Sequence, residues 1–291
     1  MSLRVLKEIQ AAVGNLNPAE VQGLADRPLS VGLVASTGAA FEAMEEFLLP
    51  IEKISDRKRL EVGSILHRTG RPGLPEGINL VLCEEGLACP PHAFTFYRDE
   101  PQRTIHEIVS QHPEFELPLA RNFYPFRQPV VDRIIHSIAK DNALFALVTA
   151  LPDVIPSLIE LPWSIGEFAS DTAFLTINQI RMAFLIAAAS DKPVGYSMQK
   201  TEIATIVTGA FGWRALAREL IGKIPFGGGL IPKGAIAFAG TYVMGLGLDR
   251  FYRLGYGLTR AERRESYQAA YERGKGLIEI VLRGIKSRNA A

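Results

Sequence analysis

The segment from residue 29 to residue 50 constrains the fold most, because two different periodicities meet in it at a tight turn. It reads LSVGLVASTGAAFEAMEEFLLP. The short apolar run Val31–Val34 is typical of a buried strand, whereas the residues after Gly38 repeat their apolar side chains at helical spacing. Strand, small-residue loop and helix also follow one another around the phosphate-binding loop G-x-x-x-x-G-K-[ST]. The segment therefore predicts a small α/β layer of P-loop-like shape.

The residues that bind phosphate in such a loop are replaced in this chain. In register with the motif, its two glycines fall on Ala35 and Ala40, with Gly38 between them. The lysine becomes Phe41 and the Ser/Thr becomes Glu42. A triphosphate needs a cation and a hydroxyl at these two positions, and here it would meet a ring and a carboxylate. We therefore expect no bound nucleotide and no other cofactor.

A second strand pattern carries a matching loss. A switch GTPase has D-x-x-G after this strand, where the Asp supports magnesium and the Gly meets the γ-phosphate. Here Cys83 replaces the Asp, and Gly86 is retained. The strand patterns are Leu29–Ala35, Ile78–Cys83 and Ala93–Tyr97. Together they predict a degenerate GTPase-like α/β domain over residues 1–120.

Beyond residue 120 the strand signal fades and helical spacing dominates. The spacing predicts helices over Gln128–Leu151, Thr172–Ser190, Met198–Thr208, Trp213–Lys223, Lys233–Tyr256 and Thr259–Arg283, with a short amphipathic helix over 1–14. The predicted fold class is therefore α/β plus all-α. A helical bundle with a basic C-terminal helix is expected over residues 121–291.

Polar side chains interrupt the apolar helix expected over 172–190. Asn178 and Arg181 are three residues apart and share a helix face, with Gln179 beside them. A buried arginine needs a carboxylate partner, for which the candidates are Asp171, Glu202 and Glu219. Two interpretations stay open: a buried polar network that fixes the packing of the helices, or a functional polar site inside the bundle.

The C-terminal region is basic. Residues 250–291 hold ten Lys/Arg and four Glu, a net charge of +6, which leaves −5 for the rest of a chain of net charge +1. Aromatic residues lie among the bases at Arg250, Tyr252, Arg253 and Tyr256. This pattern suits an anionic membrane surface or a protein partner, and no nucleic-acid motif accompanies it. The alternative is a solvated helix face on which Arg and Glu pair.

Membrane-spanning segments are not expected. The longest uncharged apolar stretch, Gly234–Leu248, has fifteen residues, fewer than the about 18 that a spanning helix needs. The stretch over 172–190 contains Arg181, which is costly at mid-bilayer. A buried core helix or a hairpin at the membrane interface fits better. The N-terminus lacks the pattern of a signal peptide, and we expect a cytoplasmic protein, associated with the inner face of the cell membrane.

No catalytic or metal-binding constellation can be assembled. The two cysteines argue against a disulfide scaffold and fit a reducing compartment. Cys83, Cys89 and His92 lack zinc-site spacing and a fourth ligand, so we expect no metal. The glycine-rich run 226–233 reads as a turn between helices, although such a run could also cradle an anion at the start of the next helix.

Residues 120–256 resemble a bacterial domain of unknown function, family number 697, the YcjF-like helical domain. The residues that carry the resemblance are ALFALVTALPDVIP (143–156), LTINQIRMA (175–183), the glycine-rich stretch 212–245 and DRFYRLGYG (249–257). The family is a helical module that follows Era-like GTPase domains. The resemblance implies this architecture and an association with membranes, and it transfers no catalytic residue.

These observations favour a non-catalytic scaffold or regulatory protein, built on a GTPase-like domain that has lost its nucleotide. Its partner would be an unidentified protein or an anionic membrane surface, and nucleic acid is not expected. Two alternatives stay open. One is a helical module inserted in the membrane or its interface, and the other is a nucleotide-dependent enzyme that uses the glycines at 227–233.

Overall fold

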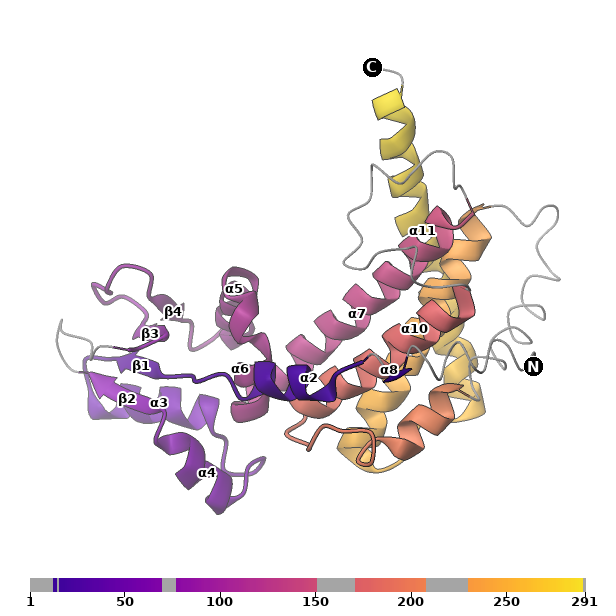
Figure 1. Ribbon diagram of the computed structural model, residues 1–291. Coiled ribbons are helices and arrows are strands. Elements are labelled where there is room, and N and C mark those ends of the chain that lie inside the picture. Colours follow the sequence, from indigo (N-terminus) through magenta and orange to yellow (C-terminus); the bar gives the residue numbers. More distant parts are fainter. Residues whose placement is uncertain (1–12, 15, 70–76, 151–170, 208–229, 290–291) are drawn as a thin grey trace. The chain divides into compact units, whose positions relative to one another are not determined.

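A computed structural model describes residues 13–14, 16–69, 77–150, 171–207 and 230–289 of the chain (Figure 1). The chain divides into two compact units. Residues 19–132 and 187–193 form a unit that contains a sheet, and the remaining residues form a helical unit. The division after residue 132 falls inside a helix, twelve residues beyond the boundary expected from the sequence at 120.

The sheet consists of four parallel strands in the order β2-β1-β3-β4. Their bounds are β1 (Val31–Val34), β2 (Leu66–Thr69), β3 (Leu80–Glu84) and β4 (Phe94–Phe96). Val31 is in register with Leu66 on one side and with Leu80 on the other. The order matches the first four strands of a flavodoxin-like doubly wound sheet, in which ligands bind outside the carboxyl ends of β1 and β3.

Burial explains the order of the strands. The side chains of β1 and β3 are almost wholly buried on both faces, as central strands of a parallel sheet require. The predicted strands are confirmed: β1 and β4 are shorter than predicted, and β3 begins two residues later and ends one residue later. Strand β2 was not predicted, because Thr69 is its one buried residue and the polar run LHRT has no apolar alternation.

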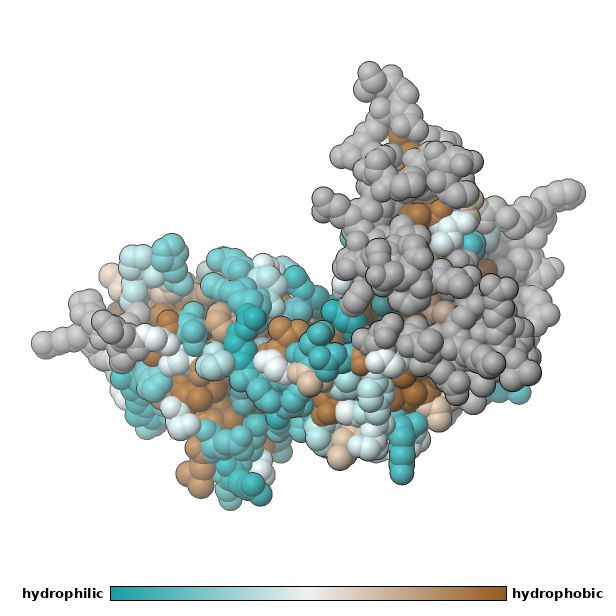
Figure 2. Space-filling view, viewed as in Figure 1, coloured by the Kyte–Doolittle hydropathy of each residue, from teal (hydrophilic) through white to brown (hydrophobic). Residues whose placement is uncertain are grey.

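Helices α3 (Gly38–Leu48), α4 (Asp56–Gly63) and α5 (Pro101–Gln111) belong to the same unit, with α2 (Pro18–Ala25) and α6 (Glu116–Asn122). Helix α3 packs on β1 and α5 packs on β4 (Figure 1). Helix α3 begins where the sequence predicted, because the Thr37 hydroxyl caps it by accepting a hydrogen bond from the Ala40 N–H. Hydrophilic side chains surround small apolar patches on the face of this unit in Figure 2.

The connection from β3 to β4 is unusually short for two parallel strands. It runs through residues 85–93, which contain no helix, whereas such a crossover ordinarily includes one. Two features tighten it. Gly86 adopts a positive φ of 86°, which glycine tolerates, and a disulfide joins Cys83 to Cys89.

The second half of the chain is helical, as predicted. Its elements are α7 (Tyr124–Val148), α8 (Asp171–Ala189), a helical segment over residues 200–207, α10 (Leu230–Leu254) and α11 (Arg260–Asn289). Helices α10 and α11 pack side by side after a turn in which Gly255 has a φ of 82° (Figure 1). The helices predicted over 1–14 and 213–223 lie outside the described residues, apart from 13 and 14, which are helical.

Two helices are long and apolar enough to cross a membrane, judged by length and composition alone. They are the segment Thr172–Ala189 of α8 and the segment Ile231–Leu254 of α10. The first is 89% buried inside the structure, as the core helix of a soluble protein is, whereas the second is 56% buried. The segment of α10 is longer than the uncharged stretch Gly234–Leu248 of the sequence, because the helix continues past Asp249 to Leu254.

Candidate functional site

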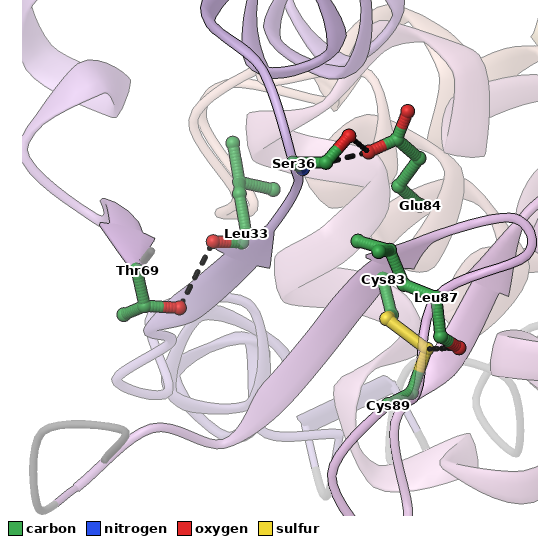
Figure 3. Close-up of a disulfide and its surroundings, with 7 residues drawn as sticks. All are labelled: Leu33, Ser36, Thr69, Cys83, Glu84, Leu87 and Cys89. Carbon is green, nitrogen blue, oxygen red and sulfur yellow. Dashed lines mark hydrogen bonds between the residues drawn. A yellow bond between two sulfur atoms is a disulfide. The ribbon is translucent and has the colours of Figure 1, made fainter. Parts of the chain in front are cut away.

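The loop between β1 and α3 is closed by a carboxylate from the neighbouring strand. Glu84, the last residue of β3, accepts two hydrogen bonds through Oε2, from the backbone N–H and from the hydroxyl of Ser36. Both distances are 2.7 Å (Figure 3). The two bonds lower the pKa of Glu84, the backbone bond more than the hydroxyl bond. The side chain is therefore an anion at neutral pH.

This contact lies where a doubly wound sheet binds its ligands. β1 and β3 are adjacent, and the chain leaves them for opposite sides of the sheet, β2 beyond β1 and β4 beyond β3. The crevice at such a switch point is the general ligand site of the fold, and the start of the following helix favours an anion there. In this chain the anion is Glu84.

The positions aligned with the phosphate motif do not form a phosphate loop. Three residues, 35–37, separate β1 from α3, whereas six precede the lysine of the motif. Ala35 is buried and Gly38 starts the helix, so Ala40, Phe41 and Glu42 all lie within the first turns of α3. Few backbone N–H groups are left outside the helix to surround a phosphate.

A cation does lie near these positions, and it is paired. Arg68 of β2 donates to both carboxylate oxygens of Glu45, at 2.6 and 2.7 Å, and its guanidinium lies 5.7 Å from the centre of the Phe41 ring. Its pKa is raised, chiefly by the hydrogen bond to Glu45. Phe41, in the position of the motif lysine, thus contacts an arginine whose charge Glu45 already neutralises.

Cys83 and Cys89 are joined by a disulfide, which the expectation of a reducing compartment did not predict. Cys83 is fully buried at the end of β3, and Cys89 is exposed in the loop that follows. The turn after β3 brings their Cα atoms to 5.9 Å, and the sulfurs form a disulfide (Figure 3). The number of cysteines does not reveal this turn, which brings Cys89 back to Cys83. Within the described parts of the chain, no group of three or more His, Cys, Asp or Glu side chains could hold a metal ion.

The polar residues of α8 meet partners that the sequence argument missed. Asn178 donates to the side-chain oxygen of Asn142 at 2.8 Å, and Asn142 donates to the Thr241 hydroxyl at 2.8 Å. Gln179 donates to the same hydroxyl at 3.1 Å. All four side chains are buried, and they join α7, α8 and α10. Asn142 lies at the polar start of the run DNALFALV and was not among the predicted partners.

The remaining candidates for this network have other described contacts or lie outside the described residues. Arg181 is close enough to Asp141 of α7 to lower the pKa of that residue, against the larger effect of burial, which raises it. Asp171 is the first residue of α8, whereas Glu219 lies outside the described residues. Glu202 is buried beside the hydroxyl of Tyr252, and it helps burial to raise the pKa of that tyrosine.

The expected basic-aromatic surface is largely neutralised by its own carboxylates. Arg250 donates to Glu262 at 2.5 Å, and its guanidinium lies 5.1 Å from the centre of the Tyr256 ring. Arg253 pairs with Asp249, four residues earlier, at 2.8 Å. The pair of Arg250 with Glu262 joins α10 to the start of α11, where Thr259 and Glu262 cap each other in a capping box, whereas the pair of Arg253 with Asp249 lies within α10. Tyr252 is turned inward to Glu202, so Tyr256 is the exposed one of the two tyrosines.

Comparisons with known proteins were made at three levels. No family model, no curated protein and no solved structure matched the chain.

The glycine-rich run 226–233 falls mostly outside the described residues, and Lys233 at its end donates to the Thr149 hydroxyl at 3.1 Å. The loop at Ser36 is therefore the site on which a functional proposal depends.

Proposed function

We propose that this chain is a non-catalytic scaffold or regulatory protein whose α/β unit has the form of a nucleotide-binding domain and holds no nucleotide. One observation carries the proposal: the Glu84 carboxylate takes the N–H and hydroxyl groups of Ser36 at the ligand edge of the sheet. In a nucleotide-binding loop such groups contact phosphate. Here an anion of the same chain replaces the phosphate permanently.

Electrostatics reinforces this replacement. A phosphate that approached Ser36 would meet the ionised Glu84 and the exposed Glu42, and like charges at close range repel by amounts that phosphate hydrogen bonds must overcome. Arg68 is the cation described near these positions, and it is paired with Glu45. A loop without a nucleotide cycle is suited to constitutive binding of a partner.

Calorimetric titration of the full chain with GTP and ATP in the presence of Mg²⁺ tests the nucleotide part of the proposal. We expect no saturable heat. A micromolar dissociation constant that Ser36→Ala abolishes would overturn the proposal, because it would place a nucleotide in this loop. Arg103→Gln, a change at an exposed ion pair on α5, is the matched control.

The scaffold part is tested by capture of partners from the native cells after cross-linking. The bait would be compared with a variant, Phe41→Ala, that alters the exposed start of α3 without touching Ser36 or Glu84. A partner lost with this variant would assign the binding surface to the retired loop. Turnover of any nucleotide by the purified chain would contradict the assignment as a non-enzyme.

A helical module at the membrane is the second candidate, and one observation favours it. The segment Ile231–Leu254 of α10 has the length and composition of a spanning helix and is only 56% buried inside the structure. Carbonate extraction of native membranes tests it: retention in the pellet supports insertion, whereas release or a wholly soluble protein rejects it. The same fractions show the state of Cys83 and Cys89 by thiol labelling, since a cytoplasmic location predicts reduced thiols.

A further inference from the structure

A cluster of positive side chains lies in the sheet-containing unit, away from the Ser36 loop. It surrounds Asp191, which follows α8 and belongs to this unit. Lys58 Nζ of α4 lies 3.2 Å from one carboxylate oxygen of Asp191, and Arg121 Nε of α6 lies 3.5 Å from the other. The side chains of Lys58 and Arg121 are only 15% and 22% exposed. Arg127 is close enough to feel the same carboxylate.

Arg127 is the member of the cluster with a buried N–H, at Nε, that has no acceptor among the described residues. Burial lowers the pKa of its guanidinium, which Asp191 offsets in part, and its ring contact is with Tyr124 at 5.5 Å. A buried guanidinium N–H without an acceptor is costly, so such groups ordinarily face a carboxylate, a phosphate or water.

The position of Arg127 in its helix adds to the positive field. It lies in the first turn of α7, a helix of 25 residues with no acidic side chain in that turn. The N-terminus of a long helix favours a negative charge and disfavours a cation, because the aligned peptide dipoles leave it partly positive. A cation in this place is stabilised when an anion binds beside it.

The positive side chains of the cluster outnumber its one partly buried carboxylate. Lys58, Arg121 and Arg127 contribute three positive charges, and Asp191 contributes one negative charge. Asp26, 3.0 Å from Arg121, and Glu61, 3.8 Å from Lys58, bring the formal net charge of these groups to zero. Both of these side chains are more than half exposed, so solvent weakens their attraction to the cations. Ser190, next to Asp191, has a buried hydroxyl with no partner in the described structure.

We propose that the cluster of Lys58, Arg121 and Arg127 is a binding site for a phosphate group. Guanidinium groups present paired N–H donors that match phosphate oxygens, and a lysine adds a point charge. Phosphate carries up to two negative charges near neutral pH and has several acceptor oxygens, so one phosphate group can accept hydrogen bonds from more than one of these cations. The site is independent of the Ser36 loop, so it neither requires nor excludes the proposed loss of the nucleotide.

The test is calorimetric titration of the full chain with inorganic phosphate, against chloride at matched ionic strength. We expect saturable binding to the wild-type protein. Arg127→Gln should weaken it about tenfold or more, because a charge-assisted hydrogen bond is lost. Arg103→Gln, which removes a guanidinium at an exposed pair of the same unit, should leave the affinity unchanged within about twofold.

A second variant has the opposite expected sign. Asp191→Asn removes the internal carboxylate that competes for the same cations, and it should tighten phosphate binding severalfold. A merely structural ion cluster responds differently: neither variant would reveal phosphate binding. Absence of saturable binding in both the wild-type protein and Asp191→Asn overturns the proposal, as does binding that Arg127→Gln leaves unchanged.

The phosphate group could belong to a soluble compound or to a lipid headgroup, and vesicles distinguish the two. Phosphatidylcholine vesicles with and without phosphatidic acid would be floated with the wild-type protein and with Arg127→Gln. Flotation that needs both phosphatidic acid and Arg127 assigns a lipid source. Phosphate binding without such flotation assigns a soluble ligand.

Discussion

Two glycines on the same helix are expected to differ in how substitution by alanine changes the free energy of unfolding. A Cβ at Gly274 of α11 would lie 2.8 Å from Cβ of Phe238 and 3.1 Å from Cα of Ala235, both on α10. A Cβ at Gly276, two residues further, would meet no atom within 4 Å. Alanine at either position gains helix propensity, whereas only alanine at 274 must push two helices apart.

The magnitudes follow from these distances. Gly→Ala in an open helical position stabilises by about 1 kcal/mol, so Gly276→Ala should raise the free energy of unfolding by that amount. Gly274→Ala has the same gain and an overpacking cost of about 1–3 kcal/mol, since one contact is with backbone. The difference between the variants isolates that cost, because the propensity gain is common to both.

Thermal unfolding followed by far-ultraviolet circular dichroism measures the difference. For units of this size, 1 kcal/mol corresponds to about 2–4 °C in Tm, so the two variants should differ by several degrees. Gly276→Ala is expected above the wild type and Gly274→Ala below Gly276→Ala. Equal stabilisation by both substitutions would refute the close approach of α10 and α11 on which this reasoning depends.

Three further predictions concern other contacts. Thr241→Val leaves two buried amide donors, one of them on Gln179, without their acceptor and should cost about 2–5 kcal/mol in urea unfolding; a loss below about 1 kcal/mol would contradict the network. The pKa of Glu262 is lowered to about 2 from 4.5, so its stabilising effect is present above pH 4.5 and is lost as the pH falls toward 2; acid titration of Glu262→Gln should lack this change. Reduction of the disulfide opens the loop that it closes between Cys83 and Cys89, and should lower the free energy of unfolding by about 2 kcal/mol. The stability of Cys89→Ser should not respond to reductant.

Local features of the fold could be predicted from the sequence. The strand and helix around Ser36 follow from a four-residue apolar run and from a threonine in the capping position, both of which act within a few residues. Strand β2 could not be found in this way, because an edge strand with one buried residue has no periodicity to detect. Tertiary pairing with β1 determines it.

The site depended on contacts that a pattern does not contain. Comparison with the phosphate motif identified the residues that were lost, Phe41 and Glu42, and gave no indication of the residue gained, Glu84, which is 48 positions from Ser36. The pairing of Arg253 with Asp249 at i,i+4, and the box of Thr259 with Glu262, are local signals that the count of charges overlooked. Net charge therefore overstated the cationic surface.

The bond between Ser36 and Glu84 also has a consequence for the order of folding. The two partners come together only after β3 has paired with β1, across a separation of 48 residues. Helix α3 and its threonine cap are local and can form before that event, so the loop would gain its final shape late, when the chain closure has already been completed. In kinetic experiments Glu84→Gln should then accelerate unfolding and leave the folding rate nearly unchanged.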